Sequence, residues 1–86
     1  MGRQPLFLLD VREPYEFAED HIDGAVNIPL DNLAERAQEL PPEVPIVCVC
    51  RSGHRSLLAA RWLRQYGYEA LSLDDGMRGW SKEGTV

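Results

Sequence analysis

Two short, unbroken apolar runs constrain the fold of this chain more than any other feature. Residues 6–9 (LFLL) and 46–50 (IVCVC) contain no polar side chain, and a charged residue follows each run directly. A strand with one face in water alternates apolar and polar side chains, whereas a strand covered on both faces does not. The two runs therefore predict buried strands of a mainly parallel sheet covered by helices.

Turn residues and apolar spacing predict the remaining elements. Proline suits the first turn of a short helix at 13–17, and Asp31 is a candidate N-cap for a helix at 31–40. A longer helix from residue 55 or 56 to 66 ends at Gly67. The other expected elements are strands at 25–28 and 69–73 and a last helical turn or two at 76–82. Strands alternating with helices predict one α/β domain, residues 1–86, with four strands.

Charge is unevenly distributed along the chain. The formal net charge is −5 at pH 7, which argues against binding to nucleic acid. Residues 44–68 contain four arginines and neither Asp nor Glu, so this segment carries +4 and the rest of the chain −9. One positive segment in an acidic protein predicts a site for a small anion.

Apolar runs of a handful of residues are too short to cross a bilayer or to form the core of a signal peptide. We therefore expect a cytoplasmic protein that does not bind membranes. The chain has two cysteines, Cys48 and Cys50, which are too few for a disulfide scaffold. With His21 and His54 as the two histidines, no usual zinc-ligand spacing is present, and we expect no metal.

The segment 50–56 (CRSGHRS) carries the chemistry. It follows a predicted strand and leads into a helix, the position at which open α/β sheets bind ligands. Amides of a curved loop and of a helix N-terminus form an anion nest, which Gly53 permits. With positive charge from Arg51, Arg55 and His54, the pKa of Cys50 should fall to about 3.5–7.5. Cys50 is the candidate nucleophile, and Cys48, lower on the strand, is expected to pack as a small apolar residue.

The sequence resembles a single-domain rhodanese, a sulfurtransferase, in four motifs that occur in the family's order. The motifs are residues 8–13 (LLDVRE), 21–29 (HIDGAVNIP), 50–56 (CRSGHRS) and 76–80 (GMRGW). Asp20 and Asp23 stand where the second motif usually has Gly and Pro, and Asp75 replaces the first glycine of the closing pair. The family usually has a further strand and helix before the first motif. The resemblance thus implies a rhodanese-like fold trimmed at the N-terminus, with four strands.

The resemblance also implies roles for the motif residues. Cys50 carries a persulfide, and the loop amides surround its outer sulfur. Arg51 steers an anionic donor, and Arg55 fixes the loop while adding positive potential. His54 lies at the rim, and His21 makes a structural hydrogen bond rather than acting as a general base. The implied substrate-binding residues are Arg51, Ser52, Gly53, His54 and Arg55, and the implied supporting residues are Asp10, Arg12 and Ser56.

The implied reaction is two-step transfer of a sulfane sulfur, with no cofactor. The expected donor is a small anion such as thiosulfate, or a persulfide; the acceptor is a thiophile, and either partner can be a protein. Two alternatives stay open. Cysteine phosphatases and arsenate reductases carry five residues between cysteine and arginine, whereas four separate Cys50 from Arg55. The other alternative is a non-catalytic or sulfur-carrier module with the same fold; a non-catalytic interaction module would be expected to have lost the cysteine or the loop.

Overall fold

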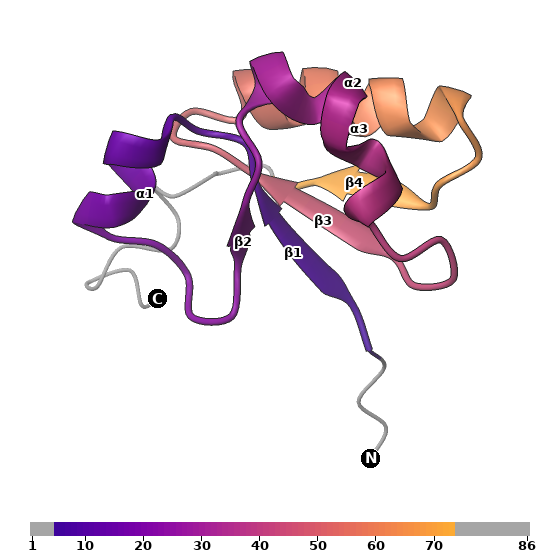
Figure 1. The fold of residues 1–86 in the computed structure, drawn as a ribbon, viewed down its shortest axis with the longest axis horizontal. Coiled ribbons are helices and arrows are strands. Elements are labelled where there is room, and N and C mark those ends of the chain that lie inside the picture. Colours follow the sequence, from indigo (N-terminus) through magenta and orange to yellow (C-terminus); the bar gives the residue numbers. More distant parts are fainter. Residues whose placement is uncertain (1–4, 74–86) are drawn as a thin grey trace.

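Four parallel strands form the sheet in the computed structural model, which describes residues 5–73. The strands are β1 (Phe7–Asp10), β2 (Val26–Asn27), β3 (Ile46–Val49) and β4 (Ala70–Ser72). They pair in the order β2-β1-β3-β4, and all three pairings are parallel (Figure 1). This confirms the predicted α/β fold with its four-stranded sheet. The last predicted helical turns, at 76–82, lie outside the described residues.

Three α-helical segments accompany the strands. They are α1 (Pro14–Glu19), α2 (Leu33–Arg36) and α3 (His54–Gln65). The connections from β2 to β3 and from β3 to β4 cross the sheet in the same direction. Right-handed crossovers of this kind place their helices on one face. Accordingly, Ala59 and Leu63 of α3 and Leu33 of α2 join Leu9 and Cys48 of the strands in one buried core.

The prediction of one continuous helix over 31–40, capped by Asp31, is wrong. Short 3₁₀ turns at Leu30–Asn32 and Ala37–Glu39 flank the four residues of α2, and Asp31 lies inside the first turn. The backbone reaches φ −104° and ψ 0° at Asn32 and φ −111° and ψ 8° at Arg36, outside the α-helical region. At these two residues the regular ladder of helical hydrogen bonds is interrupted.

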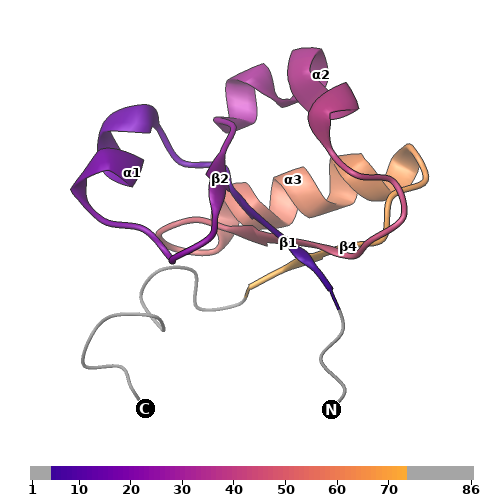
Figure 2. The ribbon, with the colours of Figure 1, turned by 60° about the horizontal axis from the view of Figure 1, so that its bottom comes forward.

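The carboxyl ends of β1 and β3 define the edge of the sheet at which the candidate site lies. Asp10 pairs in register with Val49, so the two strands end side by side. Two views place α1 at this end of the sheet, apart from α2 and α3 (Figure 1, Figure 2). The loop after β3 and the helix after β1 are therefore neighbours. Among the described residues, no helix is long and apolar enough to cross a membrane.

Candidate active site

Cys50 follows the last residue of β3, and a loop of three residues joins it to α3. Gly53, the N-cap of α3, has φ 92° and ψ −12°, in the left-handed region. A residue with a Cβ would be strained there by about 1–2 kcal/mol. The helix thus begins at His54, one or two residues earlier than the sequence predicted, and its first amides turn back toward Cys50.

The sulfur of Cys50 is enclosed by hydrogen-bond donors. Its Sγ atom accepts hydrogen bonds from the amides of Gly53, at 3.1 Å, and Ser56, at 3.2 Å, and lies 3.5 Å from Ser56 Oγ. Burial opposes the thiolate and is the largest single influence on the pKa of Cys50, whose exposure is 0%. The Ser56 hydroxyl and the amides of Ser56, Gly53 and Ser52 outweigh it together, so the pKa is lowered.

Cys48 lies on the same face of β3, two residues before Cys50, in a different environment. It belongs to the buried core and has 0% exposure. Burial raises its pKa to about 12. A thiol of this kind is inert at neutral pH, because the thiolate is the reactive form. The two cysteines of the chain are therefore chemically distinct, and Cys48 sits in the core as the sequence predicted.

Arg55 is held by a residue that the sequence analysis missed. Its Nη1 and Nη2 atoms donate to Oε1 and Oε2 of Glu16, at 2.9 and 3.1 Å. Glu16 Oε1 also accepts from the amide of Glu13, at 2.8 Å. The hydrogen bond with Arg55 is the main reason that the pKa of Glu16 is lowered. An acidic residue in the first turn of the helix after β1 was the available signal, yet that segment was read only as helix-forming.

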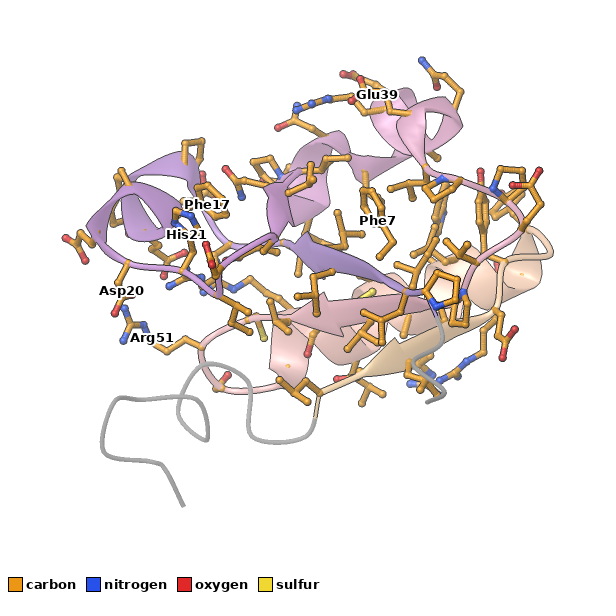
Figure 3. The ribbon with its side chains drawn as sticks, turned by 90° about the horizontal axis from the view of Figure 1, so that it is seen from below. Phe7, Phe17, Asp20, His21, Glu39 and Arg51 are labelled. Atoms are coloured by element: carbon orange, nitrogen blue, oxygen red, sulfur yellow. The ribbon has the colours of Figure 1, made fainter. Side chains whose placement is uncertain are left out.

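The two loop arginines make different contacts with Glu16. The guanidinium of Arg55 pairs with Glu16, and its pKa is raised chiefly by that hydrogen bond. Arg51 Nε lies 3.9 Å from Glu16 Oε2, and its side chain is 57% exposed. Figure 3 shows Arg51 directed toward the α1 side of the molecule. The donors that contact Sγ are amides and a hydroxyl.

Asp10 and Arg12 form a buried ion pair beside the loop. Arg12 Nη2 donates to Asp10 Oδ2 at 2.8 Å, and the two side chains are 1% and 0% exposed. The same Nη2 atom donates to the carbonyl of Asp20 at 2.7 Å, and Asn27 Nδ2 donates to the carbonyls of Asp10 and Arg12. The pair thereby joins the end of β1 to β2 and to the residue after α1. Its contacts are those of a supporting element.

Ser56 is completely buried and connects the loop to β4. Its hydroxyl donates to the carbonyl of Gly53 at 3.1 Å and lies 2.7 Å from the hydroxyl of Ser72. Ser72 was also missed by the sequence analysis. A serine in a predicted strand carries no local signal, and its position follows from the parallel pairing of β4 with β3, in which Ser72 lies opposite Cys48.

The two histidines lie at the surface. His21 Nδ1 is 2.8 Å from the carbonyl of Phe17, and its ring stacks on that of Phe17 with the ring centroids 3.7 Å apart (Figure 3). This is the structural hydrogen bond that the sequence predicted. His54 is exposed at the start of α3. Within residues 5–73, no three His, Cys, Asp or Glu side chains are grouped to hold a metal ion.

Comparison with known proteins identifies relatives along nearly the whole chain. The family model of the rhodanese-like domain matches residues 1–83. Thiosulfate sulfurtransferase GlpE of Tolumonas auensis is 35% identical over 74 residues, which cover 85% of this chain and 70% of that protein. A crystal structure of a rhodanese-related protein from Thermoplasma volcanium matches with a TM-score of 0.87 and 32% identity, covering 94% of this chain and 81% of that one.

Other relatives are longer than this chain. YrkF of Bacillus subtilis, named as a sulfur carrier protein, is 40% identical over 79 residues, which cover 91% of this chain. The chain spans 43% of the length of YrkF. Proteins with different names thus contain a segment similar to this chain.

Proposed function

The chain belongs to the rhodanese-like domain family, and on this premise we propose that it transfers a sulfane sulfur through a persulfide on Cys50. The Cys50 thiolate attacks the outer sulfur of a donor such as thiosulfate. A sulfur–sulfur bond forms to Cys50 while the donor's own bond breaks, and sulfite leaves with the bonding electron pair. An acceptor thiolate then attacks the outer sulfur, and Cys50 departs as a thiolate. The cycle is balanced without an added oxidant or reductant.

The observation that carries this proposal is the set of donors around Sγ. The amides of Gly53 and Ser56 point at one atom, and the Ser56 hydroxyl lies beside it. Such a ring favours a negative charge on sulfur, both for the attacking thiolate and for the leaving thiolate of the second step. No base is required to remove a proton during the reaction. The relatives named as sulfurtransferases support the same general activity.

Burial of the sulfur adds a requirement to the mechanism. Cys50 is 0% exposed, so Sγ must first become accessible before a donor can reach it. Arg51 and Ser52 are exposed and form the outer wall of the loop 51–53. We assign to Arg51 the attraction of the anionic donor, because its side chain is more exposed than that of Arg55 and lies 3.9 Å from the Glu16 carboxylate, to which Arg55 is bound at 2.9 Å. A protein donor or acceptor would meet the same exposed loop, and a cytoplasmic location stays a prediction.

Two rival functions are weaker. A phosphatase must hold several oxygens of a tetrahedral anion, whereas the donors here converge on a single sulfur atom. The second rival is a sulfur carrier without turnover. Two observations support it, the burial of Cys50 and the name of YrkF. The lowered pKa of Cys50 favours turnover instead, because a low-pKa thiol both attacks and leaves readily.

Intact-mass measurement tests the proposal. After brief treatment with thiosulfate, the protein should gain the mass of one sulfur atom, and a thiol reductant should remove it. Cys50→Ser should abolish this gain, and Cys48→Ser, the matched control on the same strand, should retain it. Multiple turnover with thiosulfate and cyanide separates an enzyme from a carrier. No sulfur gain in the folded wild-type protein would refute the proposed chemistry.

A further inference from the structure

The hydroxyls of Ser56 and Ser72 form a chain that ends at the sulfur of Cys50. Ser56 Oγ lies 2.7 Å from Ser72 Oγ, 3.1 Å from the carbonyl oxygen of Gly53 and 3.5 Å from Cys50 Sγ. Ser56 is completely buried, and Ser72 reaches it from β4. The short Ser–Ser distance is that of a good hydrogen bond between hydroxyls. The direction of this hydrogen bond decides what Ser56 can do for the sulfur.

Counting hydrogens shows which direction a Cys50 thiolate favours. A serine hydroxyl has one hydrogen to donate and two lone pairs to accept with. When Cys50 is a thiolate, its sulfur and the Gly53 carbonyl can only accept, so Ser72 is the one of these three neighbours able to donate to Ser56 Oγ. If Ser56 instead donated to Ser72, its single hydrogen would be turned away from the thiolate. When Ser72 donates to Ser56, the Ser56 hydrogen stays with its other two acceptors, the Gly53 carbonyl at 3.1 Å and the Cys50 sulfur at 3.5 Å, and the negative charge of a thiolate draws it toward the sulfur.

We propose that Ser72 is a positioning residue that donates its hydroxyl hydrogen to Ser56 Oγ and thereby keeps the Ser56 hydrogen on the side of the Cys50 sulfur and the Gly53 carbonyl, rather than turned toward Ser72. Hydrogen bonds in such a chain polarise one another, so Ser56 becomes a better donor when its own oxygen accepts. The same donation makes Ser56 Oγ a poorer acceptor for a Cys50 S–H group. Both effects favour the thiolate over the thiol.

Removing the Ser72 hydroxyl has a predictable consequence. With Cys50 as a thiolate, the buried Ser56 oxygen then accepts from none of these neighbours. With Cys50 as a thiol, it accepts from the S–H group. The thiol form gains relative to the thiolate, and the pKa of Cys50 rises. A shift of about half a pH unit or more corresponds to part of one buried hydrogen bond.

The test measures the titration of Cys50 by thiolate ultraviolet absorbance, with the Cys50→Ser protein as the blank. Ser72→Thr and Ser72→Val form a matched pair of β-branched residues that suit a strand and differ in the hydroxyl. Ser72→Val should raise the Cys50 midpoint by about half a pH unit or more, and Ser72→Thr should leave it near the wild-type value. Leu71→Ala, at an exposed position on the opposite face of β4, controls for disturbance of the strand.

A second background isolates the route through Ser56. In a Ser56→Ala protein, Ser72→Val should shift the Cys50 midpoint no further, because the link is already missing. An unchanged midpoint in Ser72→Val, or an equal shift in both backgrounds, would overturn the proposal. If Ser72→Val does not fold, Ser72→Ala replaces it in both measurements.

This inference rests on the proposed role of Cys50 as the reacting group, but its readout is separate. The titration requires no sulfur donor. A shifted midpoint without persulfide formation would refute the sulfur-transfer function and retain the positioning role of Ser72. Persulfide formation with an unshifted midpoint would support the sulfur-transfer function and refute the positioning role of Ser72.

Discussion

Arg55 and Glu16 form a bidentate ion pair, with Arg55 Nη1 2.9 Å from Glu16 Oε1 and Arg55 Nη2 3.1 Å from Glu16 Oε2. The two residues are 39 positions apart in the chain and join the first turn of α3 to α1. Glu16 is largely buried, whereas the Arg55 side chain is 32% exposed. The loop around Cys50 is therefore braced from outside, by a residue that does not touch the sulfur.

Glu16→Gln should weaken the contact between Glu16 and Arg55. The uncharged amide keeps the shape but loses the charge-assisted hydrogen bonds, so the free energy of unfolding should fall by about 1.5–3 kcal/mol. Sulfur transfer should fall as well, because Arg55 and the loop lose their fixed position. Urea unfolding and a thiosulfate–cyanide assay measure the two effects. Glu39→Gln, which breaks the exposed Arg36–Glu39 pair, is the control and should have a much smaller effect, because solvent screens that pair. Equal effects of the two substitutions would contradict the prediction.

The same pair predicts how stability depends on pH. The hydrogen bond with Arg55 is the main reason that the folded-state pKa of Glu16 lies below its ordinary value of 4.5. Its stabilisation is therefore complete above pH 4.5 and is lost as the pH falls through the lower, folded-state value. The difference in unfolding free energy between wild type and Glu16→Gln should shrink on acidification over that range. A difference that is constant from neutral to acidic pH would rule out this origin.

The two cysteines should differ sharply in alkylation. The pKa of Cys50 lies below its ordinary value of 9.0, because the surrounding hydrogen bonds outweigh burial, the largest single influence. The pKa of Cys48 is about 12 because of burial. Iodoacetamide at neutral pH should therefore label Cys50 in the folded protein and Cys48 only after unfolding. Peptide mapping of the labelled chain measures both sites, and comparable labelling of Cys48 in folded protein would disprove the assignment.

Local sequence signals predicted the strands and the position of Cys50 well. The apolar runs at 6–9 and 46–50 are local signals, because consecutive apolar side chains indicate a buried strand. The glycine in the segment after β3 is also a local signal, because it marks where the loop can turn. The break at Asn32 was not predictable in this way. Its flanking apolar residues have the same spacing in one continuous helix as in three short pieces, so the pattern does not distinguish them.

Contacts between distant segments were the part of the site that the sequence did not reveal. Glu16 reaches Arg55 because β1 and β3 are neighbours and end together, and Ser72 reaches Ser56 because β4 pairs with β3. Both contacts depend on strand order, which no local pattern encodes. The sequence could suggest that Arg55 fixes the loop and adds positive potential, but it could not identify Glu16 as the partner.

Loop length should decide which anion the site accepts. The donors from Gly53 and Ser56 converge on one sulfur atom at 3.1 and 3.2 Å. A phosphate or arsenate group has several oxygens, and each needs its own donor at about 2.7–3.0 Å. With four residues between Cys50 and Arg55, we expect the ring of donors to be too narrow to admit that group with its central atom in line for attack. Wild-type protein should therefore not hydrolyse aryl phosphates and should bind arsenate weakly at best.

Inserting one glycine after Gly53 tests this directly. The longer loop should widen the ring, lower sulfur transfer and improve arsenate binding, while phosphatase activity stays absent for want of a general acid. A glycine inserted after Gly67 is the matched control, since Gly67 also has φ 92° and lies just beyond the other end of α3. The control should keep wild-type sulfur transfer, and circular dichroism checks that both variants are folded. Efficient phosphatase activity in the wild-type protein would overturn the proposed function, because a ring that fits a single sulfur cannot also position a phosphate for attack.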